Sequence, residues 1–466
     1  MPDPAPPMRH LAPNEYDFRL NGRLVSVSKA APNLAPLDFL RHAQGRERFF
    51  WHDGRTGETL AGMGVAVELM GWGEARVGAI ERQARALFQH AELSRVDDPN
   101  AQPRLFGGFA FRDDFVPDEA WTGFNPGHFI LPHLQLTRAD ATSRLTLSAL
   151  VAADEALDDA VEQLDAALSI WLDELRAAVS RPDPDHDPAS ELRYPLDQAS
   201  WTAMIDQALE QFATTPLEKV VLSRICEVRQ AQRIAVTPAL DRLLTRYPDC
   251  FVFLFEPRPY HAFFGATPEL LAATHGVELE SMALAGSIQR GATRAEDEAL
   301  AAALLNSAKD RREHQLVVSA LRKRLAPVTA ELTAADAPTI LRLNNIQHLY
   351  TPVQGVLQAP HGILPMVNLL HPTPALGGTP RNIALPFIRT VEPAPRGWYA
   401  APVGWINAEL DGTFAVAIRS AVAQQSRAWL YAGAGIVAGS IAEKEWDETG
   451  WKFRPMLEAI GVADIR

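Results

Sequence analysis

The stretch AGAGIVAGSIAEKEWDETGWK (residues 432–452) joins a glycine-rich apolar run to a charged run with helical spacing. Residues three and four apart share a helix face, so Glu445, Glu448 and Lys452 are predicted to project the same way. Two carboxylates and an ammonium group beside bare backbone amides can hold a divalent cation and an anionic ligand. A solvated helix with ordinary charge pairs is the alternative, and the rest of the chain must decide between the two.

The composition is that of a soluble globular protein. The chain has 466 residues, of which 47% are hydrophobic and 22% charged, enough for two or three domains or one large α/β domain with an additional lobe. A net charge of −13 without a basic tract argues against nucleic-acid binding. Cys226 and Cys250 form neither a CxxC pair nor a zinc-binding spacing, which fits a reducing cytoplasm. No apolar run is long enough to cross a membrane, and the N-terminus lacks a signal peptide. Residues 1–15 are expected to be a disordered leader.

Helices and strands are mixed along the chain without strict βαβ alternation. Helical spacing predicts helices at 74–90, 158–180, 200–214 (capped by Ser200) and 294–325. Apolar runs predict strands at 18–30, 217–229, 249–257 and 341–357, and a hairpin at Asp411–Gly412. This mixture favours an α/β fold with a mixed or antiparallel sheet. The Pro/Asp-rich linker at 181–190 separates an N-terminal part, 16–190, from a second region, 191–466. No nucleotide-phosphate motif is present.

Three residues have surroundings suited to proton transfer. Lys219 begins a largely apolar strand, where burial would lower its pKa and permit a general-base role. Glu269 follows FFGATP, and a carboxyl group among aromatic residues can stay protonated as a general acid. His348 is either a base or a hydrogen-bonded core histidine. The alternative for Lys219 is a side chain that reaches solvent from a strand edge, and the alternative for Glu269 is a glutamate at the start of a helix.

Two carboxylate pairs on separate helices are candidate metal ligands, Asp310 with Glu313 and Glu445 with Glu448. If they face each other, they would form a Mg²⁺ site with positions left for water and a substrate carboxylate. A solvated helix face is the alternative for each pair. Arg419 is a charge within an apolar strand and requires an anionic partner, from either the protein or a ligand.

Eight strings resemble, in order, the chorismate-utilising enzymes, a family that includes isochorismate synthases, salicylate synthases, anthranilate synthase component I and aminodeoxychorismate synthase. The strings are LEKVVLSR (217–224), GATPELL (265–271), ALAGSIQRG (283–291), KDRREHQLV (309–317), LHPTPALGG (370–378), FAVAIRSA (414–421), YAGAGIV (431–437) and EKEWDETGWK (443–452). The resemblance covers residues 195–463 and is weak before them, chiefly LFGGFAF. It implies one large fold, a two-layer sheet core flanked by helices, with the active site in a cleft between the halves and residues 191–466 as the chorismate-binding region.

The resemblance also implies roles for single residues. Lys219 takes the position of the base that activates water, and Glu269 that of the acid that protonates the departing C4 hydroxyl of chorismate. Water then adds at C2 with migration of the double bonds, which gives isochorismate.

The remaining matched positions bind metal or substrate. Glu313 and Glu448 match ligands of Mg²⁺, which binds the ring carboxylate, while Glu445 and Asp310 hold the metal through water. The positions that bind substrate carboxylates in the family match Tyr399, Arg419, Gly433 (by its backbone) and Lys452. Gly286 matches a glycine that lets substrate approach the backbone, and His348 lies near the ring.

The choice within the family depends on two positions. Family members that use ammonia generally carry glutamine at the position of Lys219, so lysine indicates water as the nucleophile. Salicylate synthases tend to carry threonine where this chain has Ala375. The sequence therefore predicts a monomeric, cytoplasmic isochorismate synthase, an isomerase without a glutaminase partner, feeding menaquinone or siderophore biosynthesis. Salicylate synthase, an ammonia-using synthase and a non-catalytic chorismate-binding homologue are the alternatives.

Overall fold

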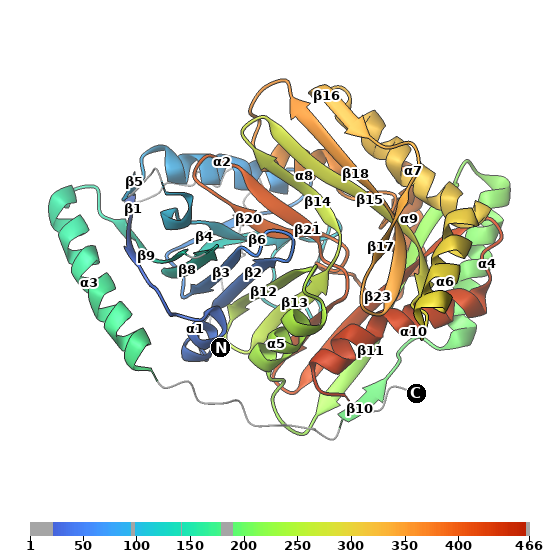
Figure 1. Cartoon of the computed structure of the whole chain (residues 1–466), viewed down its shortest axis with the longest axis horizontal. Coiled ribbons are helices and arrows are strands. Elements are labelled where there is room, and N and C mark those ends of the chain that lie inside the picture. The colour runs from blue at the N-terminus through green and yellow to red at the C-terminus, as the bar shows by residue number, and fades with distance from the viewer. Residues whose placement is uncertain (1–21, 95–97, 141, 179–189, 463–466) are drawn as a thin grey trace, which may run out of the picture.

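A computed structural model describes residues 22–94, 98–140, 142–178 and 190–462. The expected leader (1–15) and all but the last residue of the expected linker (181–190) lie outside these ranges. Two large β-sheets form the centre of the molecule and helices surround them (Figure 1). The described helices are α1 (Pro36–His42), α2 (Arg76–Gln89), α3 (Leu157–Ala177), α4 (Gln198–Thr214), α5 (Val236–Arg246), α6 (Arg294–Asn306), α7 (Ala308–Leu325), α8 (Ile363–Leu370), α9 (Arg381–Val391) and α10 (Ala442–Ala459).

The first sheet contains 13 strands in the described residues. Their order is β10 (Ser190–Arg193), β11 (Lys219–Gln230), β23 (Arg427–Val437), β22 (Ser420–Gln424), β13 (His261–Thr267), β12 (Phe251–Arg258), β2 (Arg48–Asp53), β3 (Thr59–Met63), β8 (Leu134–Ala139), β9 (Thr142–Val151), β1 (Arg23–Ala30) and β5 (Glu92–Leu93), while β19 (Gly378–Thr379) pairs with β11. Only β1 and β5 pair in parallel within this described sheet.

The second sheet contains ten strands in the same residues. Their order is β16 (Thr329–Ala334), β18 (Ile346–Leu357), β15 (Glu278–Gln289), β14 (Leu270–His275), β21 (Gly412–Val416), β20 (Pro402–Ile406), β6 (Leu105–Phe109), β7 (Gly127–Leu131) and β4 (Val67–Gly71), while β17 (Thr339–Arg342) pairs with β18. Its pairings are antiparallel. The predicted α/β fold with a two-layer, mixed or antiparallel sheet core is therefore confirmed.

Both sheets run through both halves of the chain. In the first sheet β2 pairs with β12, and in the second β6 pairs with β20. Between the sheets, Phe49 of β2 stacks on Phe106 of β6 with ring centroids 6.1 Å apart. Each such buried aromatic ring contributes roughly 1.5–3 kcal/mol. The start of the catalytic region at residue 191 remains a prediction, and the hydrophobic core is shared across that position.

Two predictions about helices were wrong. The helix expected at 294–325 is broken at Ser307, which ends α6 and caps α7 by accepting a hydrogen bond from the Asp310 amide. The third predicted helix begins at Gln198, because the Asp197 carboxylate accepts the Ser200 amide at 2.8 Å and so acts as the cap in place of Ser200. In both cases a short polar side chain accepts a hydrogen bond from a free backbone amide in the first turn of a helix.

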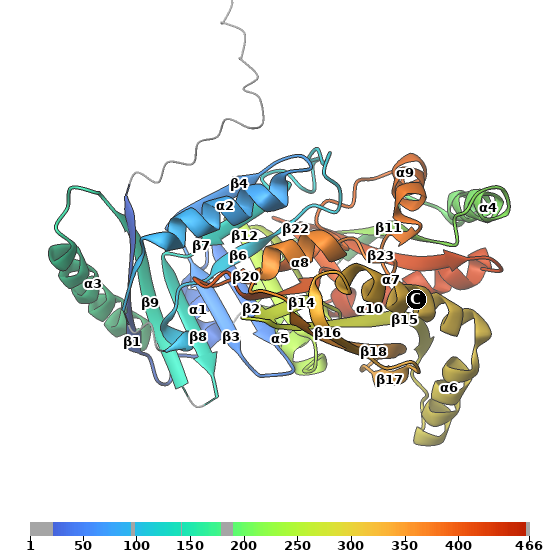
Figure 2. The same ribbon diagram turned by 90° about the horizontal axis from the view of Figure 1, so that it is seen from above.

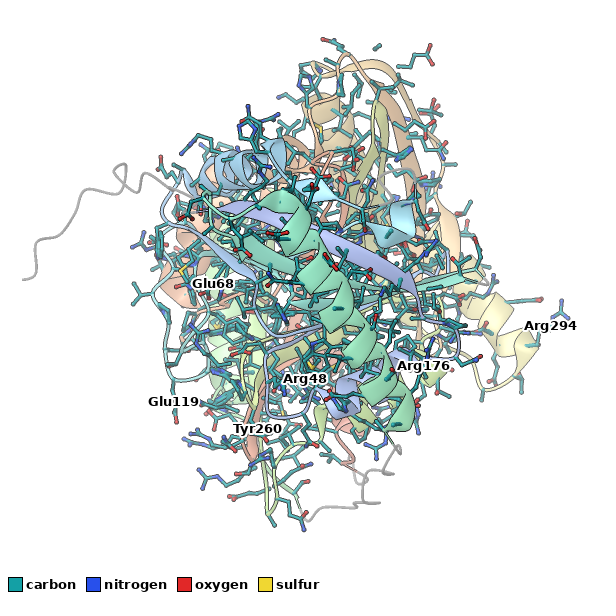
Figure 3. All side chains as sticks on the ribbon, turned by 90° about the vertical axis from the view of Figure 1, so that its left-hand side faces the viewer. Arg48, Glu68, Glu119, Arg176, Tyr260 and Arg294 are labelled. Carbon is teal, nitrogen blue, oxygen red and sulfur yellow. The ribbon has the colours of Figure 1, made fainter. Side chains whose placement is uncertain are left out.

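The long axis of the molecule runs from α3 at one end to α4 and α6 at the other (Figures 1 and 2). Helix α3 lies across the outer face of β1 and β9 and faces the viewer in Figure 3. Helices α4, α7 and α10 lie at the opposite end, beside β11, β23 and β15. Among the described helices, none is both long and apolar enough to cross a membrane.

Candidate active site

Strands β11 and β23 form the centre of the candidate site. Lys219 pairs with Val437 and Ser223 with Gly433 in their antiparallel register. A Cβ atom at Gly435 would lie 2.5 Å from Oε1 of Glu313 and 3.2 Å from Cε of Lys219. Glycine at this position therefore leaves the space that the Lys219 and Glu313 side chains occupy.

One pocket brings together twelve of the thirteen predicted site residues. Its volume is about 840 Å³, open solvent at its mouth included. The predicted residues on its wall are Glu269, Gly286, Asp310, Glu313, His348, Ala375, Tyr399, Arg419, Gly433, Glu445, Glu448 and Lys452. They come from strands of both sheets, from α7 and α10, and from four connecting segments, which carry Glu269, Ala375, Tyr399 and Arg419 (Figure 1). The thirteenth, Lys219, lies directly behind this wall.

Lys219 is fully buried and forms an ion pair with Glu313, with Nζ 2.8 Å from Oε1. Burial opposes ionisation of the Glu313 carboxyl, but the ammonium groups of Lys219, Lys452 and Lys309 outweigh it and lower its pKa. Glu313 is therefore an anion that faces the pocket and connects it to Lys219.

The carboxyl group of Glu269 differs from that of Glu313 because its pKa is raised and not lowered. It lies between β13 and β14, so the helix start considered above does not occur, and it is only 3% exposed. Burial raises its pKa to about 8, although the charges of Lys219, Lys452 and Arg419 act in the other direction. At neutral pH the carboxyl on this part of the wall holds a proton and can donate it.

Helix α10 presents its charged face to the pocket, as the spacing predicted. Lys452 forms an ion pair with Glu448 at 2.7 Å and donates a hydrogen bond to the Gly433 carbonyl at 2.7 Å. Lys309 of α7 forms an ion pair with Glu445 at 2.9 Å. Burial raises the pKa of Glu445, and the neighbouring charge of Glu448 raises it further.

Four carboxylates therefore face one pocket, and their oxygen atoms are the ligands that Mg²⁺ prefers. Burial raises the pKa of Asp310, and the charges of Glu313 and Glu448 add to the effect. This repulsion is what a divalent cation would relieve, so the residues fit such an ion. Within the described residues no three potential ligands converge closely enough to form a ligand cluster. Each of the four carboxylates is held by a neighbouring polar group instead. Glu313, Glu445 and Glu448 form ion pairs with lysines, and Asp310 accepts a hydrogen bond from the Ser307 hydroxyl.

Arg419 and His348 form a second polar group on the wall. Arg419 Nη2 donates to Nε2 of His348 at 2.8 Å, and Nδ1 of the same ring lies 3.0 Å from Oγ of Ser287. Burial and the nearby Arg419 and Lys452 charges keep the pKa of His348 well below its usual value. His348 is therefore neutral, with its proton on Nδ1, and orients Arg419. Nη1 of Arg419 is buried without a partner among the described residues, which leaves a donor for an anionic ligand.

Tyr399 and two glycines shape the rest of the pocket. A Cβ atom at Gly433 would lie 3.1 Å from the Tyr399 hydroxyl, and Gly286 adopts a φ of 76°, which favours glycine. Tyr399 stacks on Tyr431 with centroids 5.2 Å apart, and burial raises its pKa, so its hydroxyl stays a donor. Ala375 reaches the wall from the segment between α8 and β19.

Several residues of this site were not predicted from the sequence, Arg224 above all. This buried arginine of β11 lies over the Trp446 ring, 3.6 Å from its centroid. Its Nε donates to Oγ1 of Thr449 at 2.7 Å and its Nη2 to the Trp446 carbonyl at 3.2 Å. Trp446 and Thr449 directly follow Glu445 and Glu448, so Arg224 fixes α10 at its two carboxylates. An arginine in an apolar strand was the available signal, the same one that identified Arg419.

Lys309, Ser287 and Tyr431 were also missed, although they contact predicted residues. Lys309 stands beside Asp310 in the quoted KDRREHQLV string, and Ser287 follows Gly286. Their contacts are made across elements distant in sequence, such as Lys309 with Glu445, and local spacing does not encode them.

Known proteins are similar to this chain over nearly its whole length. The family model described as chorismate binding enzyme matches residues 14–461. The isochorismate synthase MenF of Bacillus subtilis (strain 168) is 33% identical over 452 residues, which cover 94% of this chain and 93% of that protein. The salicylate biosynthesis isochorismate synthase of Pseudomonas aeruginosa is 37% identical over 399 residues, covering 86% and 82%. The solved structure of MenF, the menaquinone-specific isochorismate synthase from Escherichia coli, superposes with a TM-score of 0.79 at 26% identity and covers 95% of each chain.

Proposed function

Since the chain belongs to the chorismate binding enzymes, we propose that it is an isochorismate synthase that uses Mg²⁺ and water. The observation that carries the proposal is the placement of a protonated carboxyl, Glu269, in the same pocket as the Glu313 anion that contacts Lys219. The exchange of one hydroxyl position for another requires an acid and a base at separate places in one site.

In the proposed reaction a water molecule attacks C2 of chorismate and gives up a proton to the amine form of Lys219, which arises when the ammonium group of the ion pair with Glu313 first releases its own proton. The C1=C2 double bond moves to C1=C6, the C5=C6 bond moves to C4=C5, and the C4–O bond breaks. Glu269 gives its proton to the departing hydroxyl, which leaves as water. One water enters and one leaves, so the reaction is an isomerisation and runs in both directions.

The remaining residues would hold the substrate. Arg419, with its free Nη1 and its orientation by His348, would bind a substrate carboxylate, and Tyr399 would donate to the same end. Glu313 and Glu448 would ligate Mg²⁺ directly, with Glu445 and Asp310 acting through water. When bound, Mg²⁺ supplies positive charge for the ring carboxylate. Alanine at 375 favours release of isochorismate over its further conversion to salicylate.

Incubation of the purified chain with chorismate and Mg²⁺, followed by chromatography and mass spectrometry, tests the proposal. We expect isochorismate as the main product, no change on adding ammonium, and formation of chorismate when isochorismate is supplied instead. Salicylate or anthranilate as the main product would assign the chain to another branch of the family. Absence of any turnover would favour a chorismate-binding protein without catalysis.

The acid role of Glu269 predicts a specific pH dependence. The raised pKa of about 8 means that the carboxyl is protonated, and active, below this pH and ionised above it. The value of kcat/KM should therefore fall as pH rises through about 8, by about tenfold per unit beyond it. A pH series at saturating Mg²⁺ measures this limb. A profile that stays flat to high pH would exclude Glu269 as the acid.

The contacts of Arg224 predict an effect on the metal site. Arg224→Lys keeps the charge but loses the two guanidinium N–H groups that donate to Thr449 and to the Trp446 carbonyl. The neighbouring carboxylates, Glu445 and Glu448, then lose their fixed positions. We expect the Mg²⁺ concentration for half-maximal activity to rise by about 10–100-fold. Arg229→Lys, at an exposed position of the same strand, is the matched control and should leave the titration unchanged. Equal effects of both variants on the Mg²⁺ titration would contradict the positioning role.

A further inference from the structure

A second pocket lies between the two halves of the chain, away from the candidate active site. Its volume is about 1030 Å³, open solvent included, and it lies between α2 of the N-terminal part and α8 and α9 of the C-terminal part. Figure 2 shows α2 and α8 side by side. Its apolar wall consists of Val77, Phe109, Phe111, Val367, Leu385 and Pro402.

The charged residues of this pocket leave an excess of positive charge. Four arginines and three carboxylates line it, and one of the carboxylates, Asp114, is shared by Arg112 and Arg389, each at 2.7 Å. Burial lowers the pKa of the lining residue His371 to about 3, so it adds no charge. In a chain with a net charge of −13, an apolar pocket with excess cations is unusual enough to require an explanation.

The other two arginines, Arg76 and Arg381, have no ion-pair partner among the described residues. Arg76 is only 8% exposed. Its Nη1 donates to the Gly73 carbonyl at 3.1 Å, and Nη2 of Arg381 donates to the His371 carbonyl at 2.7 Å. Carbonyls accept hydrogen bonds but do not neutralise the charge. In both arginines Nε is buried without an acceptor in the described part of the chain. Burial lowers the pKa of both guanidinium groups, although the charges of Asp113 and Asp114 act in the other direction on Arg76. An anionic ligand would offset the cost of burial that remains.

We propose that this pocket binds a small aromatic monocarboxylate. The apolar wall around Phe111 and Val367 suits a ring, and Arg76 and Arg381 supply charge for one carboxylate. A single excess positive charge on the wall matches a ligand with a single negative charge. A purely inorganic anion would leave the apolar wall unused, and a neutral ring would leave the arginines unpaired.

The pocket is connected to the active site through the segment that follows α8. Arg381 and Arg324 both donate to the carbonyls of Leu370 and Pro372, at the start of this segment. Ala375 and Leu376 of the same segment line the first pocket. A ligand that engages Arg381 is therefore positioned to alter the affinity for chorismate, and this would appear as a change in KM.

Calorimetric titration of the full chain with benzoate tests the proposal, with benzamide and acetate as probes that lack the charge or the ring. Asn368 is exposed and lines the pocket, so Asn368→Asp places a negative charge there without disturbing the core. We expect the affinity of this variant for benzoate to be lower by at least about tenfold. Gln163→Glu, the same charge change on exposed α3, should bind benzoate like the unmodified chain. Both variants should keep the basal activity.

Arg419→Met separates the two pockets, because it removes the unpaired donor of the first pocket only. Benzoate binding that persists in Arg419→Met and is weakened in Asn368→Asp would support the second site. The proposal is overturned if benzoate does not bind, if Arg419→Met abolishes binding while Asn368→Asp retains it, or if benzamide binds as tightly as benzoate. These outcomes do not depend on turnover, so they are independent of the proposed function.

Discussion

Glu269→Gln is expected to lower kcat by about 10²–10⁴-fold, the usual contribution of a general acid. Glutamine fills the same space between β13 and β14 but has no proton to give to the departing hydroxyl. Affinity for chorismate should change little, because Glu269 carries no charge at neutral pH. Assays that are quenched at set times and followed by chromatographic separation of the products measure the loss of kcat. Equilibrium binding of chorismate is the control.

Stability measurements distinguish this loss from misfolding. The folded-state pKa of Glu269 is raised above its ordinary value, so the fold favours the protonated form and is destabilised as the carboxyl ionises with rising pH. Glu269→Gln removes this ionisation, so the stability of the variant relative to the unmodified chain should rise as pH increases from the ordinary value, 4.5, to about 8, and stay level above that pH. A thermal denaturation series from pH 6 to 9 checks the sign. A variant with near-normal kcat would show that Glu269 is not the acid.

Lys219→Gln is expected to lower water addition by about 10²–10⁴-fold, because glutamine cannot accept a proton from water. Glutamine is also the residue that ammonia-using members of the family carry at this position, so the substitution is compatible with the fold. Binding of chorismate should remain within a few-fold of normal, since Lys219 lies behind the pocket wall. Near-normal turnover by this variant would remove Lys219 from the base role.

The same substitution has a predictable effect on stability. Lys219 helps to hold the pKa of Glu313 below its ordinary value, so the ion pair stabilises the fold above that value, 4.5, and the stabilisation is lost as pH falls through the folded-state pKa. The difference in free energy of unfolding between the two proteins should be present at pH 7 and shrink below about pH 4.5. Denaturant unfolding at both pH values measures it. Arg229→Lys, exposed on the same strand, should show no such pH dependence.

Local sequence patterns predicted the parts of this protein that depend on local structure. Glu445, Glu448 and Lys452 share a helix face because of their spacing, and the structure places all three on the pocket wall. Glu269 was a candidate acid because aromatic residues precede it, and its raised pKa agrees with that expectation. The convergence of these elements in one pocket came only from the resemblance to a family, since no spacing in the chain relates α7 to α10.

Contacts between distant residues were beyond those patterns. The break at Ser307 depends on one hydroxyl group reaching the Asp310 amide, and the helical spacing continues through it. The pairing of β2 with β12 depends on register between segments far apart in the chain, which no local pattern encodes. The apolar strand around Arg224 marked it as an unusual charge, but its contacts with Trp446 and Thr449 of α10 are again between residues distant in sequence.

The pairing of β11 with β23 also determines when the active site can form. Lys219 stands near the middle of the chain and its partner Val437 near the end, and α10 follows β23. Closing so long a loop is a slow step in folding, and it waits until β23 and α10 have left the ribosome. Before that moment Glu269, between β13 and β14, and the carboxylates of α7 lack the wall of the pocket that β23 and α10 provide. The active site therefore cannot form before α10 has been synthesised, and a truncated chain that lacks α10 is expected to be inactive whatever else it folds.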